Sequence, residues 1–289
     1  MKKFKKIYVE ITNVCNLNCE FCPTSERTGV FMSLLQVEQV FIAIKPFADY
    51  VYLHVKGEPL LHPKIDEILD LAALHEIKVN ITTTGTLLNK VGHKLLEKSA
   101  LRQINFSLHS YNQNLAAFSK IPYFETIFNF ANKLQLSSET IISYRLWNLH
   151  GIYQPELQQA KNKIVLSEIE KAYNLLPIEE KYNPGKGIKI RERLYLNFEP
   201  QFEWPSMQNT TESETGFCHA LRTHAGILAD GTVVPCCLDG EGVMNLGNIF
   251  EKPFSEIISD RRATAIYNGF SSGTAIEPLC KKCSFKEKF

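Results

Sequence analysis

Three cysteines stand within eight residues near the start of the chain, directly after a short apolar segment. Cys15, Cys19 and Cys22 follow residues 7–12, whose apolar side chains predict a β-strand. Thiolates are soft ligands, so this loop can hold an iron–sulfur cluster or a zinc ion. A structural zinc site needs a fourth ligand nearby, and the next histidine is His54. A cluster of four irons held by three cysteines keeps one iron for a non-protein ligand. The spacing therefore favours iron and leaves zinc as the alternative.

The pattern CxxxCxxC, with the aromatic Phe21 before its third cysteine, resembles the radical S-adenosylmethionine (radical SAM) superfamily. The resemblance implies that Cys15, Cys19 and Cys22 ligate a [4Fe-4S] cluster, whose free iron is chelated by the methionine moiety of SAM. It also implies that Phe21 packs near the adenine. The expected chemistry is reductive cleavage of SAM to a 5′-deoxyadenosyl radical, which takes a hydrogen atom from a substrate.

A second motif follows the next predicted strand, residues 50–55. The sequence KGEP at 56–59 is similar to the superfamily's Gly-Gly-Glu-Pro turn, with Lys56 in place of the first glycine. The resemblance implies that Gly57 and Glu58 help to bind the methionine ammonium, to which a carboxylate can offer a charge-assisted hydrogen bond. A solvated loop glutamate is the alternative for Glu58.

Two further predicted strands end in polar residues. Residues 77–82 lead into Thr84, in a stretch similar to the superfamily's Asn-Gly-Thr-Leu-Leu, and residues 103–110 contain Ser107. The resemblance implies that Thr84 and Ser107 contact the cofactor, Ser107 at the ribose or the methionine carboxylate. Arg145 is a further candidate for that carboxylate. His109 stands where an aspartate is more usual and receives no role.

Strands alternate with helical patterns up to about residue 200. Helices are expected near 65–75, 89–99 and 124–136, and residues 140–147 and 188–198 supply the fifth and sixth strands. Ser33 followed by Gln36 predicts a capping box at another helix start. Such alternation predicts an α/β fold, a partial (β/α)6 barrel over residues 1–200 with its site at the carboxyl ends of the strands.

Residues 201–289 are expected to form a separate module. Asp230-Gly231 predicts a hairpin turn, and Pro253 opens a helical pattern that runs to about residue 268. The segment resembles the Twitch module, a hairpin plus helix and a shorter relative of the SPASM domain, which carries one auxiliary [4Fe-4S] cluster. The ligands that this resemblance implies are Cys218, Cys236, Cys280 and Cys283. Zinc is again the alternative, and the adjacent Cys237 is expected to point to the opposite side.

Composition restricts the remaining classes. The chain has 289 residues and a formal net charge of +1, which indicates no nucleic-acid polymer as partner. It shows no secretory signal and no apolar stretch long enough to span a membrane, so a cytoplasmic location is expected. Eight cysteines without a secretory signal indicate metal or redox use. The expected partners are a small-molecule substrate and an electron donor such as flavodoxin or ferredoxin.

The substrate is expected to lie at the ends of the last two strands. Candidate contacts are Trp147, Asn148, His150, Asn197, Glu199 and Trp204. Over most of its length the chain resembles the queuine lyases, which cleave the glycosidic bond of queuosine or its 5′-phosphate and release queuine. Trp204 could stack on such a base, and Glu199 could bind its edge or its cationic amine. The alternatives are a peptide-modifying maturase and a non-catalytic iron–sulfur or zinc binding protein.

Overall fold

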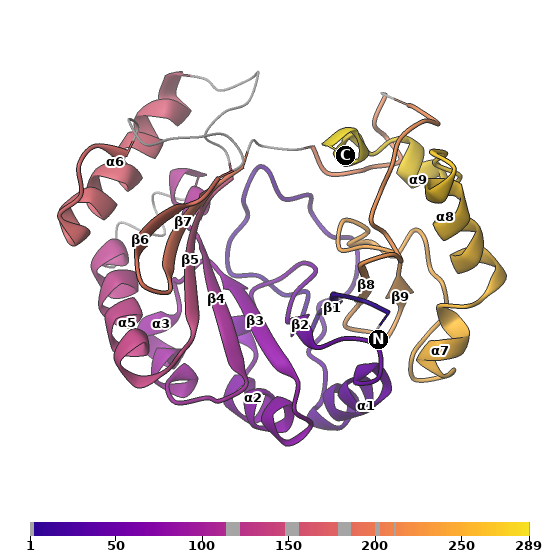
Figure 1. Cartoon of the computed structure of the whole chain (residues 1–289), viewed down its shortest axis with the longest axis horizontal. Helices are drawn as coiled ribbons and strands as arrows, with labels where there is room; N and C mark the ends of the chain where they lie inside the picture. The colour runs from indigo at the N-terminus through magenta and orange to yellow at the C-terminus, as the bar shows by residue number, and fades with distance from the viewer. Residues whose placement is uncertain are drawn as a thin grey trace. The chain divides into compact units, whose positions relative to one another are not determined.

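The computed structural model describes residues 3–113, 122–147, 156–178, 186–199, 203–210 and 212–288 (Figure 1). The chain forms two compact units. The first contains Met1–Asn16, Phe21–Val79 and Phe202–Phe289, and the second contains Leu17–Glu20 and Asn80–Gln201. Strand β3 (Lys78–Thr83) begins in the first unit and ends in the second. The domain boundary that the sequence predicts at residue 200 stays a prediction.

The first unit is built around strand β1 (Lys6–Val9). It pairs in parallel with β2 (Tyr50–Tyr52) on one side and with β8 (His224–Ile227) on the other. Strand β9 (Val233–Val234) pairs antiparallel with β8, which confirms the hairpin predicted from Asp230-Gly231. A strand from the start of the chain thus lies beside one from its last quarter.

Helices of the first unit come from both the N-terminal and the C-terminal part of the chain. Helix α1 (Leu34–Ile44) begins with the predicted capping box, and α2 (Ile65–Leu74) follows the short 3-10 turn η1 (Pro59–Leu61). The single helix predicted from Pro253 is wrong. The structure has α7 (Phe254–Ile257) and α8 (Arg261–Ser271), because the Asp260 carboxylate accepts the backbone N–H of Arg262 and starts a new helix. Helix α9 (Pro278–Lys281) and the 3-10 turn η5 (Ser284–Lys288) complete the unit.

The second unit contains a mixed sheet. Strands β4 (Leu101–Ser107), β5 (Ile141–Leu146) and β7 (Leu194–Phe198) are parallel neighbours in that order. Strand β6 (Ile188–Arg191) pairs antiparallel with β7. The single sixth strand predicted over 188–198 is therefore wrong, because the chain turns back at Arg193, whose φ is 57°. The predicted α/β class is confirmed.

The two faces of this sheet differ in polarity. On one face, Phe106 and Tyr144 are buried against Phe128 and Phe130 of α5 (Tyr123–Ser137), with ring centroids 5.6–6.3 Å apart. Tyr173, at the end of α6 (Glu156–Tyr173), closes the same cluster through ring contacts with Phe128 and Tyr144. The opposite face carries hydroxyl, amide and guanidinium groups. Apolar residues thus attach the helices and leave the polar face for ligands.

Shorter elements connect these strands: α3 (Leu88–Val91), η2 (Gly92–Leu95) and η3 (Leu108–Gln113). The sequence predicts one helix near 89–99, and the structure ends it after two short turns. Within the described ranges, no helix has the length and apolar character needed to cross a membrane.

Candidate active site

The KGEP turn lies against the segment that leads into the cysteine loop. Gly57 has φ +77°, and a Cβ added there would stand 2.3 Å from the carbonyl oxygen of Thr12. The next residue, Glu58, donates its backbone N–H to the carbonyl oxygen of Val14 at 2.9 Å. Only glycine allows this approach of two backbones. The structure therefore brings the predicted SAM turn to within one residue of Cys15.

Glu58 is held rigidly inside this turn. Its residue is 2% exposed, and its Oε1 accepts the backbone N–H of Leu60 at 3.0 Å as the cap of η1. The alternative of a solvated loop glutamate is wrong. A buried carboxylate fixed by its own helix cap is suited to receive a ligand ammonium, because little side-chain freedom is left to lose on binding.

The cysteine loop carries the three cysteines predicted to ligate the SAM-binding cluster. Cys15 is exposed, whereas Cys19 and Cys22 are half-buried. Cys15, Phe21 and Cys22 belong to the first compact unit and Cys19 to the second. Burial raises the pKa of the Cys22 thiol; the Lys56 ammonium lowers it and the Glu241 carboxylate raises it. Charged groups thus lie near one of the predicted iron ligands.

Glu10 is a site residue that the sequence analysis missed. Its carboxylate is fully buried and accepts hydrogen bonds from Arg27 at 2.7 Å, from the Lys56 backbone at 3.0 Å and from the Ala229 backbone at 3.0 Å. One side chain thereby joins β1, the segment after the cysteine loop, the KGEP turn and the β8–β9 hairpin. The available signal was a charged residue within an otherwise apolar strand pattern.

In the second unit, predicted cofactor and substrate residues form one row. Ser107 is in register with Arg145, and Arg145 is in register with Asn197. Residues in register on neighbouring strands share a face, so all three lie on the polar face of the sheet. The Asn197 amide donates to the Ser143 hydroxyl at 2.7 Å. The structure therefore brings together residues that are ninety positions apart in sequence, from Ser107 to Asn197.

Arg145 and Trp147 contact one another at the end of β5. The guanidinium carbon lies 4.6 Å from the centroid of the indole ring, within the range of a cation–π contact. The His109 ring is parallel to the same indole, with centroids 6.3 Å apart, and its Nδ1 lies 3.2 Å from the Arg145 carbonyl oxygen. Burial lowers the pKa of His109 to about 4, so the imidazole is neutral at pH 7. His109 thus supports the predicted substrate residue Trp147.

Thr84 lies at the end of β3. Its hydroxyl is 3.0 Å from that of Thr86, and its carbonyl oxygen accepts a hydrogen bond from the Tyr123 hydroxyl at 2.7 Å. The aromatic residue of α5 thereby fixes the loop backbone at the position predicted to contact SAM.

The remaining substrate candidates are distributed over the chain. Glu199 is exposed and continues the sheet by donating its N–H to the carbonyl oxygen of Leu146 at 3.2 Å. Trp204 is half-buried in the first unit, and its carbonyl oxygen accepts a hydrogen bond from the Asn209 amide. Asn148 and His150 lie outside the described residues.

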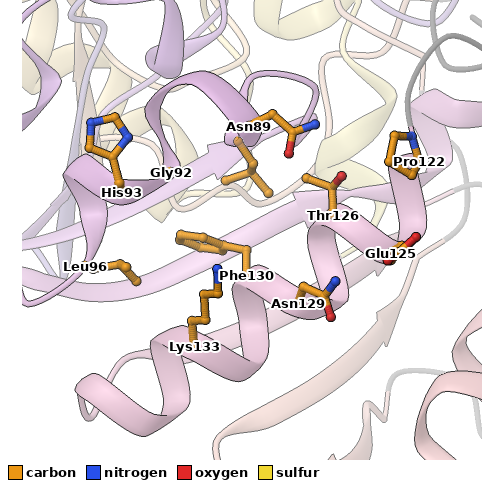
Figure 2. Close-up of a pocket in the computed structure, with 11 residues that line it drawn as sticks. Asn89, Gly92, His93, Leu96, Pro122, Glu125, Thr126, Asn129, Phe130 and Lys133 are labelled. Atoms are coloured by element: carbon orange, nitrogen blue, oxygen red, sulfur yellow. The ribbon is translucent and has the colours of Figure 1, made fainter.

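A separate hollow of about 390 Å³ lies among helices of the second unit (Figure 2). It is lined by Leu88, Asn89, Gly92, His93, Leu96, Pro122, Glu125, Thr126, Asn129, Phe130 and Lys133. Figure 2 shows Phe130 on α5 facing the turns that carry His93 and Leu96. No residue predicted for cofactor or substrate lines this hollow, so it is not part of the candidate active site.

The C-terminal module gathers the other thiols. Burial raises the pKa values of Cys218, Cys236 and Cys280, and neighbouring thiols raise them further: Cys283 for Cys218, and Cys218 for both Cys236 and Cys280. The four predicted ligands therefore lie near one another, and Cys218, Cys236 and Cys280 are largely withdrawn from water. Cys237 forms a hydrogen bond with the Tyr8 side chain, and it also raises the pKa values of Cys218 and Cys236, so it lies near the predicted ligands. Its orientation away from them stays a prediction.

Lys286 fixes the loop between the last two of these cysteines. It is 3% exposed, and its ammonium donates to the carbonyl oxygens of Cys280, Lys281 and Cys283 at 2.9–3.2 Å. Three acceptors satisfy the three donors of an ammonium group. No local pattern indicates this role, because Lys286 stands in a polar C-terminal segment.

The donor set of the C-terminal module consists of thiols. Thiolates are the usual ligands of a cluster of four irons, so the grouped cysteines fit such a cluster by their chemistry. In the part of the chain that the structure describes, no three His, Cys, Asp or Glu side chains converge as they do around one metal ion.

Comparison with known proteins agrees with this geometry. The family model of the radical SAM superfamily matches residues 9–162, and that of an iron–sulfur cluster-binding domain, SPASM, matches residues 218–284. The chain belongs to the radical SAM superfamily. It is an enzyme that uses [4Fe-4S] clusters and SAM, and it carries a SPASM-type domain at its C-terminal end.

Curated relatives are named for a nucleotide reaction. A probable GTP 3′,8-cyclase of Methanocaldococcus jannaschii is 25% identical over 293 aligned positions, which cover 90% of this chain and 96% of that protein. A probable GTP 3′,8-cyclase of Methanocella arvoryzae is 35% identical over 123 residues, 40% of this chain and 38% of that protein. The second match thus spans less than half of either protein.

Solved structures share the fold. BtrN in complex with AdoMet and 2-DOIA has a TM-score of 0.56 at 17% identity, with 98% of this chain and 94% of that chain covered. SuiB of Streptococcus suis bound to precursor peptide SuiA has a TM-score of 0.61 at 17% identity, with 97% and 71% covered. At these identities the likeness concerns the fold alone.

When bound, the reduced cluster and SAM supply a 5′-deoxyadenosyl radical that takes hydrogen from the substrate. The chain's own residues have other tasks. The KGEP turn presents a fixed carboxylate beside the cysteine loop, and the polar face of the second unit offers donors and acceptors to a ligand.

Proposed function

We propose that this protein is a radical SAM enzyme that acts on a nucleoside. Cys15, Cys19 and Cys22 hold the SAM-binding cluster, and the four grouped cysteines of the C-terminal module hold one auxiliary cluster. Gly57, Glu58, Thr84, Ser107 and Arg145 bind SAM, with Phe21 near the adenine. A donor such as flavodoxin or ferredoxin supplies the electron that SAM cleavage consumes.

The observation that carries this proposal is the polar face of the second unit. Hydroxyl and amide groups suit the hydroxyls of a ribose, whereas Trp147 offers a flat surface to a base. The side chains concerned are Thr82, Ser107, Trp147 and Asn197, which are half-buried, whereas Asn105 and Ser143 of the same face are buried and support Thr82 and Asn197 by hydrogen bonds. The curated relatives support the same substrate class, because GTP is itself a purine nucleotide.

Within that class, we propose queuosine or its 5′-phosphate as the substrate, with cleavage of the glycosidic bond and release of queuine. Glu199 is exposed at the end of β7 and would pair with the cationic amine of that base. Trp204 and Trp147 are the aromatic candidates for stacking. None of the relatives named above is named for this reaction, so its support is the overall sequence resemblance.

A second candidate is a cyclisation of GTP. It is favoured by the relative from Methanocaldococcus jannaschii, which matches 90% of this chain. A triphosphate needs several cations, whereas Arg145 is the cation that the described polar face places beside the predicted cofactor and substrate row. A nucleoside carries no triphosphate, so it fits that face better.

The test is a substrate screen with SAM and dithionite under anaerobic conditions. Queuosine or its 5′-phosphate is expected to stimulate 5′-deoxyadenosine formation and to yield free queuine. A deuterium label on the ribose position that loses hydrogen is expected in the 5′-deoxyadenosine. Trp204→Ala should weaken binding of the nucleoside more than it weakens binding of SAM.

Other outcomes would replace the proposal. Stimulation by GTP with a cyclised product would establish the second candidate. Stimulation by a short peptide alone would establish the maturase. Absence of 5′-deoxyadenosine with every substrate, in protein that retains both clusters, would leave the non-catalytic binding protein.

A further inference from the structure

Lys56, the residue at which the KGEP turn departs from the superfamily, has a contact network of its own. Its side chain is 4% exposed, and its ammonium forms an ion pair with the Glu241 carboxylate. The same ammonium donates to the carbonyl oxygen of Pro23 at 3.0 Å. Pro23 follows Cys22 directly, so Lys56 joins the turn to the cysteine loop and to the C-terminal module.

Glu241 holds the same stretch of chain at two further points. Its Oε2 accepts hydrogen bonds from the Ser25 hydroxyl and from the Glu26 backbone N–H, both at 3.2 Å. One carboxylate from the C-terminal module thus binds Lys56 of the KGEP turn, together with a hydroxyl and a backbone donor within the four residues that follow Cys22. Bonds to a charged acceptor are stronger than neutral ones.

The loop that presents Glu241 is itself fixed. A Cβ at Gly240 would lie 2.8 Å from Cε of Lys56, so a glycine is needed there for the lysine side chain to pack against this backbone. The buried Asp239 accepts the backbone N–H groups of Val243 at 2.9 Å and Met244 at 2.7 Å. Asp239 is three residues from Cys236, an assigned ligand of the auxiliary cluster. A short, ordered connection therefore runs from one cluster loop to the other.

We propose that Lys56 and Glu241 are positioning residues through which the C-terminal module supports the cysteine loop and sets the charge around the SAM-binding cluster. The proposal rests on the assignment of Cys15, Cys19 and Cys22 as ligands of that cluster. The lysine and glutamate neutralise one another, so removal of either leaves one charge beside Cys22. Net charge near an iron–sulfur cluster is one of the factors that set its reduction potential.

Two variants test the charge effect, because they should act in opposite directions. Lys56→Met keeps the aliphatic stem against Gly240 and leaves the carboxylate unneutralised, so the reduction potential of the SAM-binding cluster should fall. Glu241→Gln leaves the ammonium unneutralised, so the potential should rise. Redox titration followed by electron paramagnetic resonance measures both, with the auxiliary cluster in the same sample as reference. Lys56→Arg keeps the charge and should restore the wild-type potential.

A third variant tests the mechanical support. Glu241→Ala removes the bonds to Ser25 and Glu26 as well as the ion pair with Lys56. A chelator should then extract iron from the SAM-binding cluster at least about tenfold faster, since the loss of even one charge-assisted hydrogen bond has an effect of that size. Glu251→Ala is the matched control, since Glu251 is an exposed glutamate of the same module. It should behave as wild type.

If the reduction potential shifts in the same direction in Lys56→Met and Glu241→Gln, or in neither, the proposed charge effect is wrong. If Glu241→Ala and Glu251→Ala release iron at the same rate, the proposed support of the cysteine loop is wrong. Failure of the ligand assignment is distinguishable from both, because it would appear as full iron retention after joint replacement of Cys15, Cys19 and Cys22.

Discussion

Replacement of Glu10 by Gln tests whether one buried carboxylate holds the first unit together. Glu10 pairs with Arg27 at 2.7 Å, and the two side chains are 0% and 15% exposed. Oε1 accepts from Arg27 and from the Lys56 backbone, and Oε2 accepts from the Ala229 backbone. Either orientation of a glutamine amide would direct its NH2 group at a donor, and would leave the Arg27 charge without its counter-ion.

Breaking such a buried pair from one side costs about 3 kcal/mol or more. For a domain of this size, that corresponds to a fall in Tm of about 6–12 °C. Circular dichroism during heating measures it. Glu67→Gln is the control, since the Lys64–Glu67 pair is 53% and 52% exposed, and should change Tm by less than about 2 °C. Glu10→Gln with Arg27→Met should recover part of the loss. A Tm of Glu10→Gln within about 2 °C of wild type would refute the claim that the buried Glu10 carboxylate stabilises the first unit.

Three further substitutions test separate parts of the structure. Gly57→Ala should abolish SAM binding by equilibrium dialysis, because its Cβ would meet the Thr12 carbonyl at 2.3 Å; unchanged affinity would contradict the close approach. Folding lowers the pKa of His109 to about 4 from 6.5, so its contribution to stability is present above pH 6.5 and is lost as pH falls from 6.5 to 4. His109→Asn should make the decrease in Tm between pH 6.5 and pH 4 smaller. An unchanged dependence of Tm on pH would contradict the role of His109. Lys286→Met loses the bonds to three carbonyls, so a chelator should extract iron from the auxiliary cluster at least about tenfold faster and leave the SAM-binding cluster unaffected. The same rate of iron loss from the auxiliary cluster in variant and wild type would contradict this role.

Much of the local structure could be predicted from the sequence. The Asp230-Gly231 turn and the Ser33 capping box depend on residues a few positions apart, and both are confirmed. The 188–198 hairpin could not be predicted, because alternation continues through a turn that Arg193 makes without a glycine. The break at Asp260 was missed for a similar reason, since a capping residue lay within a continuous helical pattern.

The long-range part of the site was beyond local patterns. Lys56 could be recognised as a departure from the superfamily motif, but its partner Glu241 is 185 residues away. Ala229, which donates to Glu10, is 219 residues away from it. Such pairs depend on the packing of β8 against β1, and no spacing rule within one sequence indicates that packing.

Iron counting after replacement of the cysteines tests the central claim most directly. Anaerobically reconstituted protein is expected to contain about eight irons per chain as two [4Fe-4S] clusters, because seven cysteines are assigned as ligands. Joint replacement of Cys15, Cys19 and Cys22 by Ala should leave about four irons in the C-terminal module, and no 5′-deoxyadenosine should form from SAM and dithionite. Eight irons in that variant, or zinc without iron in the anaerobically purified wild type, would contradict the account.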